Sequence, residues 1–235
     1  MGHSMPNTAA GTSSAATSGA SRSARSLLMA SLVAGPLYVL VGGAEALTRP
    51  GFDPTRDDWS LLSNGGLGWI QVALFIVTGL LTIAGALGMR RALAGGRAST
   101  WGPLLIALYG LGLIGAGVFV ADPARAFPPG TPADAHAISW HGLMHFVCGG
   151  VGFIGLIAAC MVFARRFAGL GQRAWAAYSV ATGVVFFAAF VGVAAGSQPG
   201  GPLLVLVTLA FTGAVVLGWA WIAALSVRLI VELRA

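Results

Sequence analysis

The sequence predicts an all-α integral membrane protein, a polytopic bundle of six transmembrane helices with both termini in the cytoplasm. Of its 235 residues, 57% are hydrophobic and only 9% are charged, whereas a soluble domain carries about a quarter charged residues. Long apolar runs take the place of the missing charges, and the arginines gather in alternate connecting segments. These runs lack the alternation of lipid-facing and lumen-facing residues that membrane β-barrels show, so helices are expected.

Six apolar runs each approach the roughly 20 residues that a helix needs to cross a bilayer. Residues 1–25 come before them and are rich in Ser, Ala, Thr and Gly, so we expect a disordered N-terminal tail. The remaining residues 26–235 form the transmembrane domain. Its expected spans are residues 27–47, 67–89, 102–121, 139–163, 174–196 and 203–227.

The arginines predict the orientation, because basic residues accumulate in cytoplasmic loops. All 13 basic residues are arginines. Only Arg49, Arg56 and Arg125 belong to segments on the opposite side from the two termini. We therefore expect a multi-pass protein of the cell (plasma) membrane. The net charge of +6 follows from these basic loops, so the expected partners include membrane lipids and exclude nucleic acid.

One stretch, residues 122–146, collects an unusual share of the titratable groups, among them three of the four histidines. His141 and His145 are four residues apart and share one helix face. Ser139 is expected to be the N-cap of the fourth span, and Asp122 ends the third because Pro123 cannot continue it. The proline-rich segment between them predicts a stiff lid that brings Asp122 close to His141 or His145.

Three interpretations of this polar cluster remain open from the sequence. Asp122, His141 and His145 are three usable zinc ligands, with a fourth position left for water. The same groups can instead hydrogen-bond between helices, or handle a substrate or ion. No cofactor besides a possible zinc is indicated. The further candidates for a polar or structural site are Glu45, Ser63, Asn64, Ser139 and His136.

The placement of charged residues relative to the spans restricts the possible functions further. Glu45 and Arg49 form an i,i+4 pair near the end of the first span, which we expect to be solvated. No Asp, Glu, Lys or Arg is expected in the middle of a span, which argues against an ion-coupled transporter or a proton pump.

The motifs "LSNGGLGWIQ", "GLGLIGAGVFVADPARAFPPGTP" and "SWHGLMH" resemble the bacterial and archaeal membrane family called domain of unknown function 998. The resemblance extends from the first span to the last and implies a multi-span helical protein without an established activity. A looser resemblance is to the seven-span ceramidase and adiponectin-receptor-like hydrolases, in which a Ser, an Asp and three His hold zinc. Here Ser63, Asp122, His141 and His145 are similar in kind, but this chain has six spans and its histidine pair opens the fourth.

Two functions therefore remain open from the sequence. The chain is expected to be a structural or binding membrane protein with an extracytoplasmic Asp/His site under a proline-rich loop. The alternative is a metal-dependent hydrolase acting on a lipid or other small substrate at the outer leaflet. Whether the protein is an enzyme, and in which oligomeric state it works, does not follow from the sequence.

Overall fold

The computed structural model describes residues 9–93, 95–96, 98–135, 137–196 and 202–234. Six long helices follow one another in this part of the chain, and a short 3-10 helix separates the first two. Each long helix contains a segment long and apolar enough to cross a membrane, which confirms the expected six-helix architecture. The elements are α1 (Ala9–Thr48), η1 (Trp59–Ser63), α2 (Gly68–Ala92), α3 (Ala98–Val118), α4 (Trp140–Gly169), α5 (Arg173–Gly196) and α6 (Pro202–Glu232).

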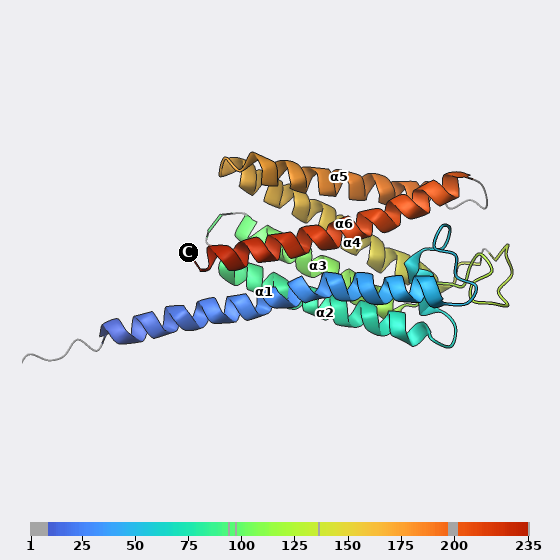
Figure 1. Cartoon of the computed structure of the whole chain (residues 1–235), viewed down its shortest axis with the longest axis horizontal. Coiled ribbons are helices and arrows are strands. Elements are labelled where there is room, and N and C mark those ends of the chain that lie inside the picture. Colours follow the sequence, from blue (N-terminus) through green and yellow to red (C-terminus); the bar gives the residue numbers. More distant parts are fainter. Residues whose placement is uncertain (1–8, 94, 97, 136, 197–201, 235) are drawn as a thin grey trace, which may run out of the picture.

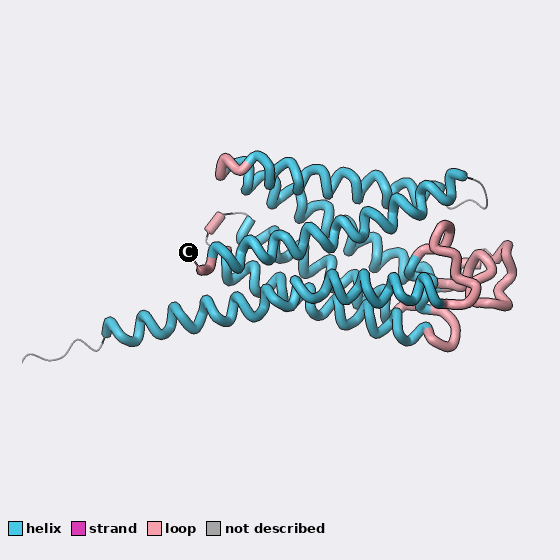
Figure 2. Tube along the Cα trace, viewed as in Figure 1, coloured by secondary structure: helices cyan, strands magenta, loops and turns pink. Residues whose placement is uncertain are grey.

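The helices form a closed ring in which each packs on the next and α6 returns to α1. Consecutive helices run in opposite directions, so the start of α1 and the end of α6 lie at the same end of the bundle (Figure 1). We call this the arginine end. The opposite end carries residues 49–67, 119–135 and 137–139, whose loops gather there in Figure 2, and we call it the loop end.

Glycines allow the closest helix crossings, because a helix in lipid packs by direct backbone approach rather than by the hydrophobic effect. A Cβ placed on Gly112 of α3 would lie 2.6 Å from the Cα of Gly152 on α4. A Cβ on Gly79 of α2 would lie 2.6 Å from the carbonyl oxygen of Gly110 on α3. These two contacts hold α2, α3 and α4 together as one side of the ring.

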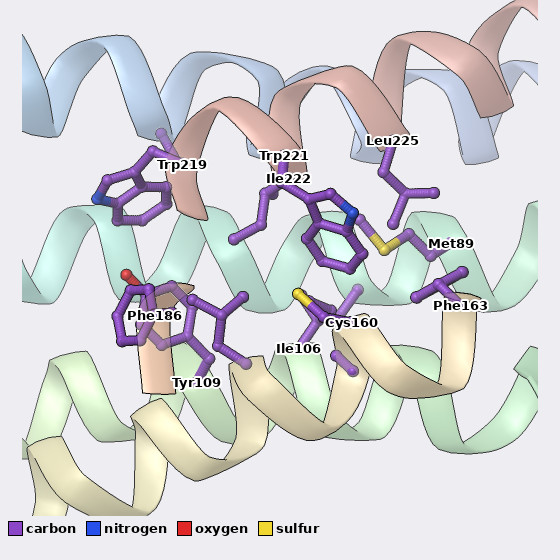
Figure 3. Close-up of a cluster of buried hydrophobic side chains, with 14 of the residues drawn as sticks. Met89, Ile106, Tyr109, Cys160, Phe163, Phe186, Trp219, Trp221, Ile222 and Leu225 are labelled. Carbon is purple, nitrogen blue, oxygen red and sulfur yellow. The ribbon is translucent and has the colours of Figure 1, made fainter. Parts of the chain in front are cut away.

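Large side chains fill the ring from its middle toward the arginine end. Figure 3 shows Trp219 and Tyr109 at one side of this cluster, with Leu225, Met89 and Phe163 at the other. All five are almost completely buried.

The tail is where the structure departs most from the expected boundaries. α1 begins at Ala9, so the helix runs through most of the segment expected to be disordered, and residues 1–8 lie outside the described residues. Alanine-rich sequence favours helix, and the end of the segment also makes contacts. Arg91 donates a hydrogen bond to the Oγ of Ser23 (2.6 Å), and Ala24 is buried.

Candidate functional site

The segments at the loop end fold back onto the bundle as a packed cover, by which we mean residues 49–67, 119–135 and 137–139. Phe127 is completely buried and meets Phe52 edge to face, with ring centroids 5.3 Å apart. A tight turn holds Phe127 in place, since Ala124 and Phe127 exchange both backbone hydrogen bonds (3.1 and 2.8 Å). The cover is thus anchored by an aromatic pair that joins its two segments.

Arg49 holds the first segment of the cover in place through hydrogen bonds. Its guanidinium pairs with Glu45 (2.9 Å) and donates to the carbonyl oxygens of Leu62 (3.2 Å) and Asn64 (2.6 Å). The expectation of a solvated Glu45–Arg49 pair is wrong, because both side chains are only 7% exposed. The cover encloses the pair, and Arg49 lies against the ring of Phe127, 5.6 Å from its centroid.

Asn64 and Ser63 tie the cover together through the backbone. The Asn64 amide donates to the carbonyl oxygen of Ala121 in the other segment (3.0 Å) and to that of Leu61 (3.1 Å). The Ser63 hydroxyl donates to the carbonyl oxygen of Ser60 (2.6 Å). In the described residues, both candidates therefore make structural hydrogen bonds within the cover.

Asp122 caps the fourth helix together with Ser139. Its carboxylate accepts from the backbone N–H of Ser139 (2.8 Å) and from the Ser139 hydroxyl (2.6 Å). The Ser139 oxygen in turn accepts from the N–H of Gly142 (3.1 Å), which confirms Ser139 as the N-cap of α4. A Cβ on Gly142 would overlap the Asp122 carboxylate, so this close approach needs a glycine.

The structure separates the two neighbouring histidines instead of pairing them with Asp122. His145 is buried, and its Nδ1 lies 3.0 Å from the carbonyl oxygen of Ala116 and 2.9 Å from that of Phe119. His141 is exposed and lies against Trp140, with ring centroids 3.6 Å apart and ring planes tilted by 36°. Within the described residues, no hydrogen bond or ion pair joins Asp122 to either imidazole.

The proposed zinc ligands are therefore not gathered around one point. Across residues 9–93, 95–96, 98–135, 137–196 and 202–234, no three His, Cys, Asp or Glu side chains lie together as a metal ion would require. His136 lies outside the described residues. Zinc binding stays a prediction, which metal analysis of the purified protein tests directly.

The acids of the first cover segment occupy contrasting environments. Burial raises the pKa of Asp57, and it also raises that of Asp58, where the nearby Arg125 opposes it. Hydrogen bonds from Thr55 lower the pKa of Asp53. Arg125 links the segments, because its guanidinium donates to the carbonyl oxygen of Arg56 (2.8 Å) and lies 3.4 Å from the Asp58 carboxylate.

A cavity of about 120 Å³ lies inside the ring beneath the cover. Each of the six helices contributes an aromatic side chain to its wall: Tyr38, Phe75, Tyr109, Phe153, Phe190 and Phe211. Glycines of α4, including Gly149 and Gly150, leave the space open on one side. Asp58, Ser60 and His145 also line this inner cavity.

A second hollow of about 520 Å³ lies among the cover segments, and we call it the vestibule. Most of its wall is apolar, but it also includes the charged side chains of Asp53, Arg56, Asp122 and Arg125. Asp58, Ser60 and Phe146 line both the vestibule and the inner cavity. These three residues therefore form the neck between a charged compartment and an aromatic one.

Sequence reasoning missed the inner cavity. Tyr38, Phe75 and Tyr109 lie within apolar runs and were not identified as candidate site residues from the sequence. The available signal was polarity inside a span: Tyr38 of α1 lies beside Gln71 of α2, and Gln71 is fully buried. An amide within a hydrophobic run is costly unless it serves a contact or a site.

The fold and the two hollows define a multi-pass helical membrane protein with a covered cavity at one end of its bundle. The chain belongs to the family described as Protein of unknown function (DUF998), whose profile matches residues 32–228. That range reaches from α1 into α6, and it confirms the resemblance seen in the sequence motifs. Comparisons with curated proteins and with solved structures found no match.

Proposed function

We propose that the protein binds a single-chain amphiphile at the loop end of its bundle, with the polar head near the vestibule and the chain in the inner cavity. One observation carries the proposal: a compartment that holds several charged side chains and a compartment rich in aromatic ones share the neck formed by Asp58, Ser60 and Phe146. Small-molecule sites typically combine an apolar wall with a few convergent polar groups.

The inner cavity suits a hydrocarbon chain. Its aromatic wall is held by its own contacts, since Phe153 packs against Phe186, Phe190 and Phe211 with centroids 5.2 to 5.6 Å apart. A wall that is already packed costs little ordering on binding, which favours affinity. A volume of about 120 Å³ accepts part of one chain rather than a two-chain lipid.

The vestibule suits a polar head, because Arg56 and Arg125 lie there among acidic side chains. The arginine distribution supports a position for this compartment on the outer face of the plasma membrane, with the arginine end in the cytoplasm. The ligand then comes from the outer leaflet or from the space beyond it.

Photolabelling with a matched pair of variants tests the proposal. The probe is a ten-carbon alcohol with a diazirine near the end of its chain, added to protein in lipid nanodiscs. Gly149 lines the cavity, and a Cβ there meets nothing within 4 Å, so Gly149→Phe should fill the cavity and abolish labelling of its wall. Gly213 of α6 is equally open but is not part of the cavity wall, so Gly213→Phe is the control.

The expected result is labelling of peptides from α3, α4 and α6 in the unmodified protein, lost in Gly149→Phe and kept in Gly213→Phe. Equal labelling of all three proteins at lipid-facing positions would mean that the probe only dissolves in the surrounding bilayer. The proposal would then be wrong.

A further inference from the structure

The hydrogen bonds of His145 determine which of its ring nitrogens can meet a ligand. Its Nδ1 faces two carbonyl oxygens at the end of α3, those of Ala116 and Phe119. Carbonyl oxygens only accept, so Nδ1 carries the proton and Nε2 of the neutral ring is an acceptor. No described residue hydrogen-bonds to Nε2, and the ring lines the inner cavity.

Asp58 supplies a second acceptor at the neck. The contact from Arg125 to the Oδ2 of Asp58 is long, at 3.4 Å. The Oδ1 of Asp58 is buried without a hydrogen-bond partner in the described part of the chain. Ser60 lies beside it in the wall of the same neck. A buried oxygen that lacks a donor carries a desolvation cost, which a donating ligand would relieve.

From these two acceptors we infer that the amphiphile carries a hydrogen-bond-donating, uncharged hydroxyl head, which donates to His145 Nε2 or to Asp58. This inference rests on the proposed function and adds the chemical class of the ligand. A carboxylate head meets two acceptors and the charge of Asp58, so it is repelled. An ammonium head is disfavoured because Arg125 already compensates Asp58, and burying a further charge is costly.

Competition among three ten-carbon amphiphiles tests the class of head group. Decanol, decanoate and decylamine share one chain and differ only in the head, and each competes with the photoreactive alcohol in nanodiscs at pH 7.5. Decanol is expected to compete at least about tenfold better than decanoate, the equivalent of one lost hydrogen bond to a charged or buried group. Each competitor is compared at equal concentration in the bilayer, so that differences in membrane partition do not enter.

Two histidine variants test the assigned acceptor. In His145→Asn the side-chain N–H takes the place of Nδ1–H toward the α3 carbonyls, and only the Nε2 acceptor is lost. The preference for decanol is expected to fall from about tenfold to about threefold, because Asp58 still disfavours decanoate, while thermal stability stays near that of the unmodified protein. The same substitution at the exposed His141 is the control and should leave the preference unchanged.

Asp58→Asn provides a second measurement that does not depend on the fold of the histidine variant. It removes the charge and keeps an acceptor, so discrimination against decanoate should weaken while decanol still competes. A preference for decylamine, equal competition by decanol and decanoate, or an unchanged preference in both His145→Asn and Asp58→Asn would overturn the hydroxyl assignment. In each of these cases, the proposed function would still stand if Gly149→Phe abolished labelling by the photoreactive alcohol.

Discussion

At the scale of single residues, the start of α4 illustrates what local sequence determines and what it does not. Ser139 was predictable as an N-cap because a serine precedes an apolar helical run, and the structure confirms it. The partner of Asp122 was not predictable from spacing. The N-terminus of a helix offers free N–H groups to a carboxylate, and the Asp122 carboxylate accepts from the N–H and the hydroxyl of Ser139.

The first prediction concerns Gly142. Gly142→Ala places a Cβ on the Asp122 carboxylate and should separate Asp122 from Ser139, lowering the free energy of unfolding by about 1–3 kcal/mol. Thermal unfolding in detergent measures the effect. Gly149→Ala is the matched control, since a Cβ at Gly149 of the same helix meets nothing within 4 Å. Equal Tm values for the two variants would contradict the assigned contact.

The second prediction concerns the buried carboxyl of Asp57. Burial raises its pKa in the folded protein, so the folded state holds the proton more tightly than the unfolded state does. The stability contributed by this group is therefore greatest below its ordinary pKa and is lost as pH rises through the raised, folded-state pKa. Asp57→Asn removes this loss, so the Tm of the variant should exceed that of the unmodified protein at pH 7.5, and the difference should shrink on acidification.

Asp53 is the control for this pH series because its pKa is lowered by hydrogen bonds from Thr55. Its contribution to stability is present above the ordinary pKa and is lost as pH falls through the lowered one. Asp53→Asn should therefore lower the Tm at pH 7.5, the opposite sign to Asp57→Asn. A Tm difference for Asp57→Asn that did not change with pH would show that its carboxyl does not titrate as described.

At the scale of elements, the cover depends on a buried ion pair that the sequence did not identify as buried. An i,i+4 pair at the end of a helix is usually solvated, and nothing in the spacing of Glu45 and Arg49 distinguishes a solvated pair from an enclosed one. The enclosure comes from Phe127, which is 78 residues further along the chain than Arg49. Such long-range contacts are set by the fold and leave no periodic signal in the sequence.

The third prediction tests this support. Arg49→Met leaves Glu45 buried without its partner and the carbonyl oxygens of Leu62 and Asn64 without their donor, so it should cost about 3–5 kcal/mol. Arg56→Met is the control, because Arg56 pairs with Asp53 at the surface, where both side chains are more than 40% exposed. It should change the free energy of unfolding by less than about 0.5 kcal/mol.

Urea unfolding in mild detergent, followed by circular dichroism, measures both variants. Arg49→Lys is informative as a third, because a single ammonium does not serve all the acceptors of a guanidinium. It should recover only part of the lost stability. A similar small cost for Arg49→Met and Arg56→Met would mean that the cover does not depend on the enclosed pair.

At the scale of the whole molecule, hydropathy alone predicted the six helices because each must satisfy its backbone within the membrane. It did not predict the ring. Six apolar runs are compatible with several arrangements, and the closure of α6 onto α1 depends on which faces carry glycines and aromatic side chains. The inner cavity follows from that closure. Its wall could therefore not be predicted from the sequence, whereas the cluster of titratable groups in residues 122–146 could be.

The fourth prediction is the orientation of this ring in the membrane. The start of α1 and the end of α6 lie at one end (Figure 1), and an excess of arginines at that end predicts that it faces the cytoplasm. Single cysteines at Ala133 of the cover and at Ala174 of the arginine end test the assignment in a Cys148→Ala, Cys160→Ala background. Both alanines are exposed, and neither has the positive φ of the nearby Gly130 and Gly171, so each accepts a cysteine without backbone strain.

A small membrane-impermeant maleimide added to intact cells should label Ala133→Cys at once and Ala174→Cys only after the cells are permeabilised. The reverse pattern would place the vestibule in the cytoplasm, and the ligand would then have to come from the inner leaflet.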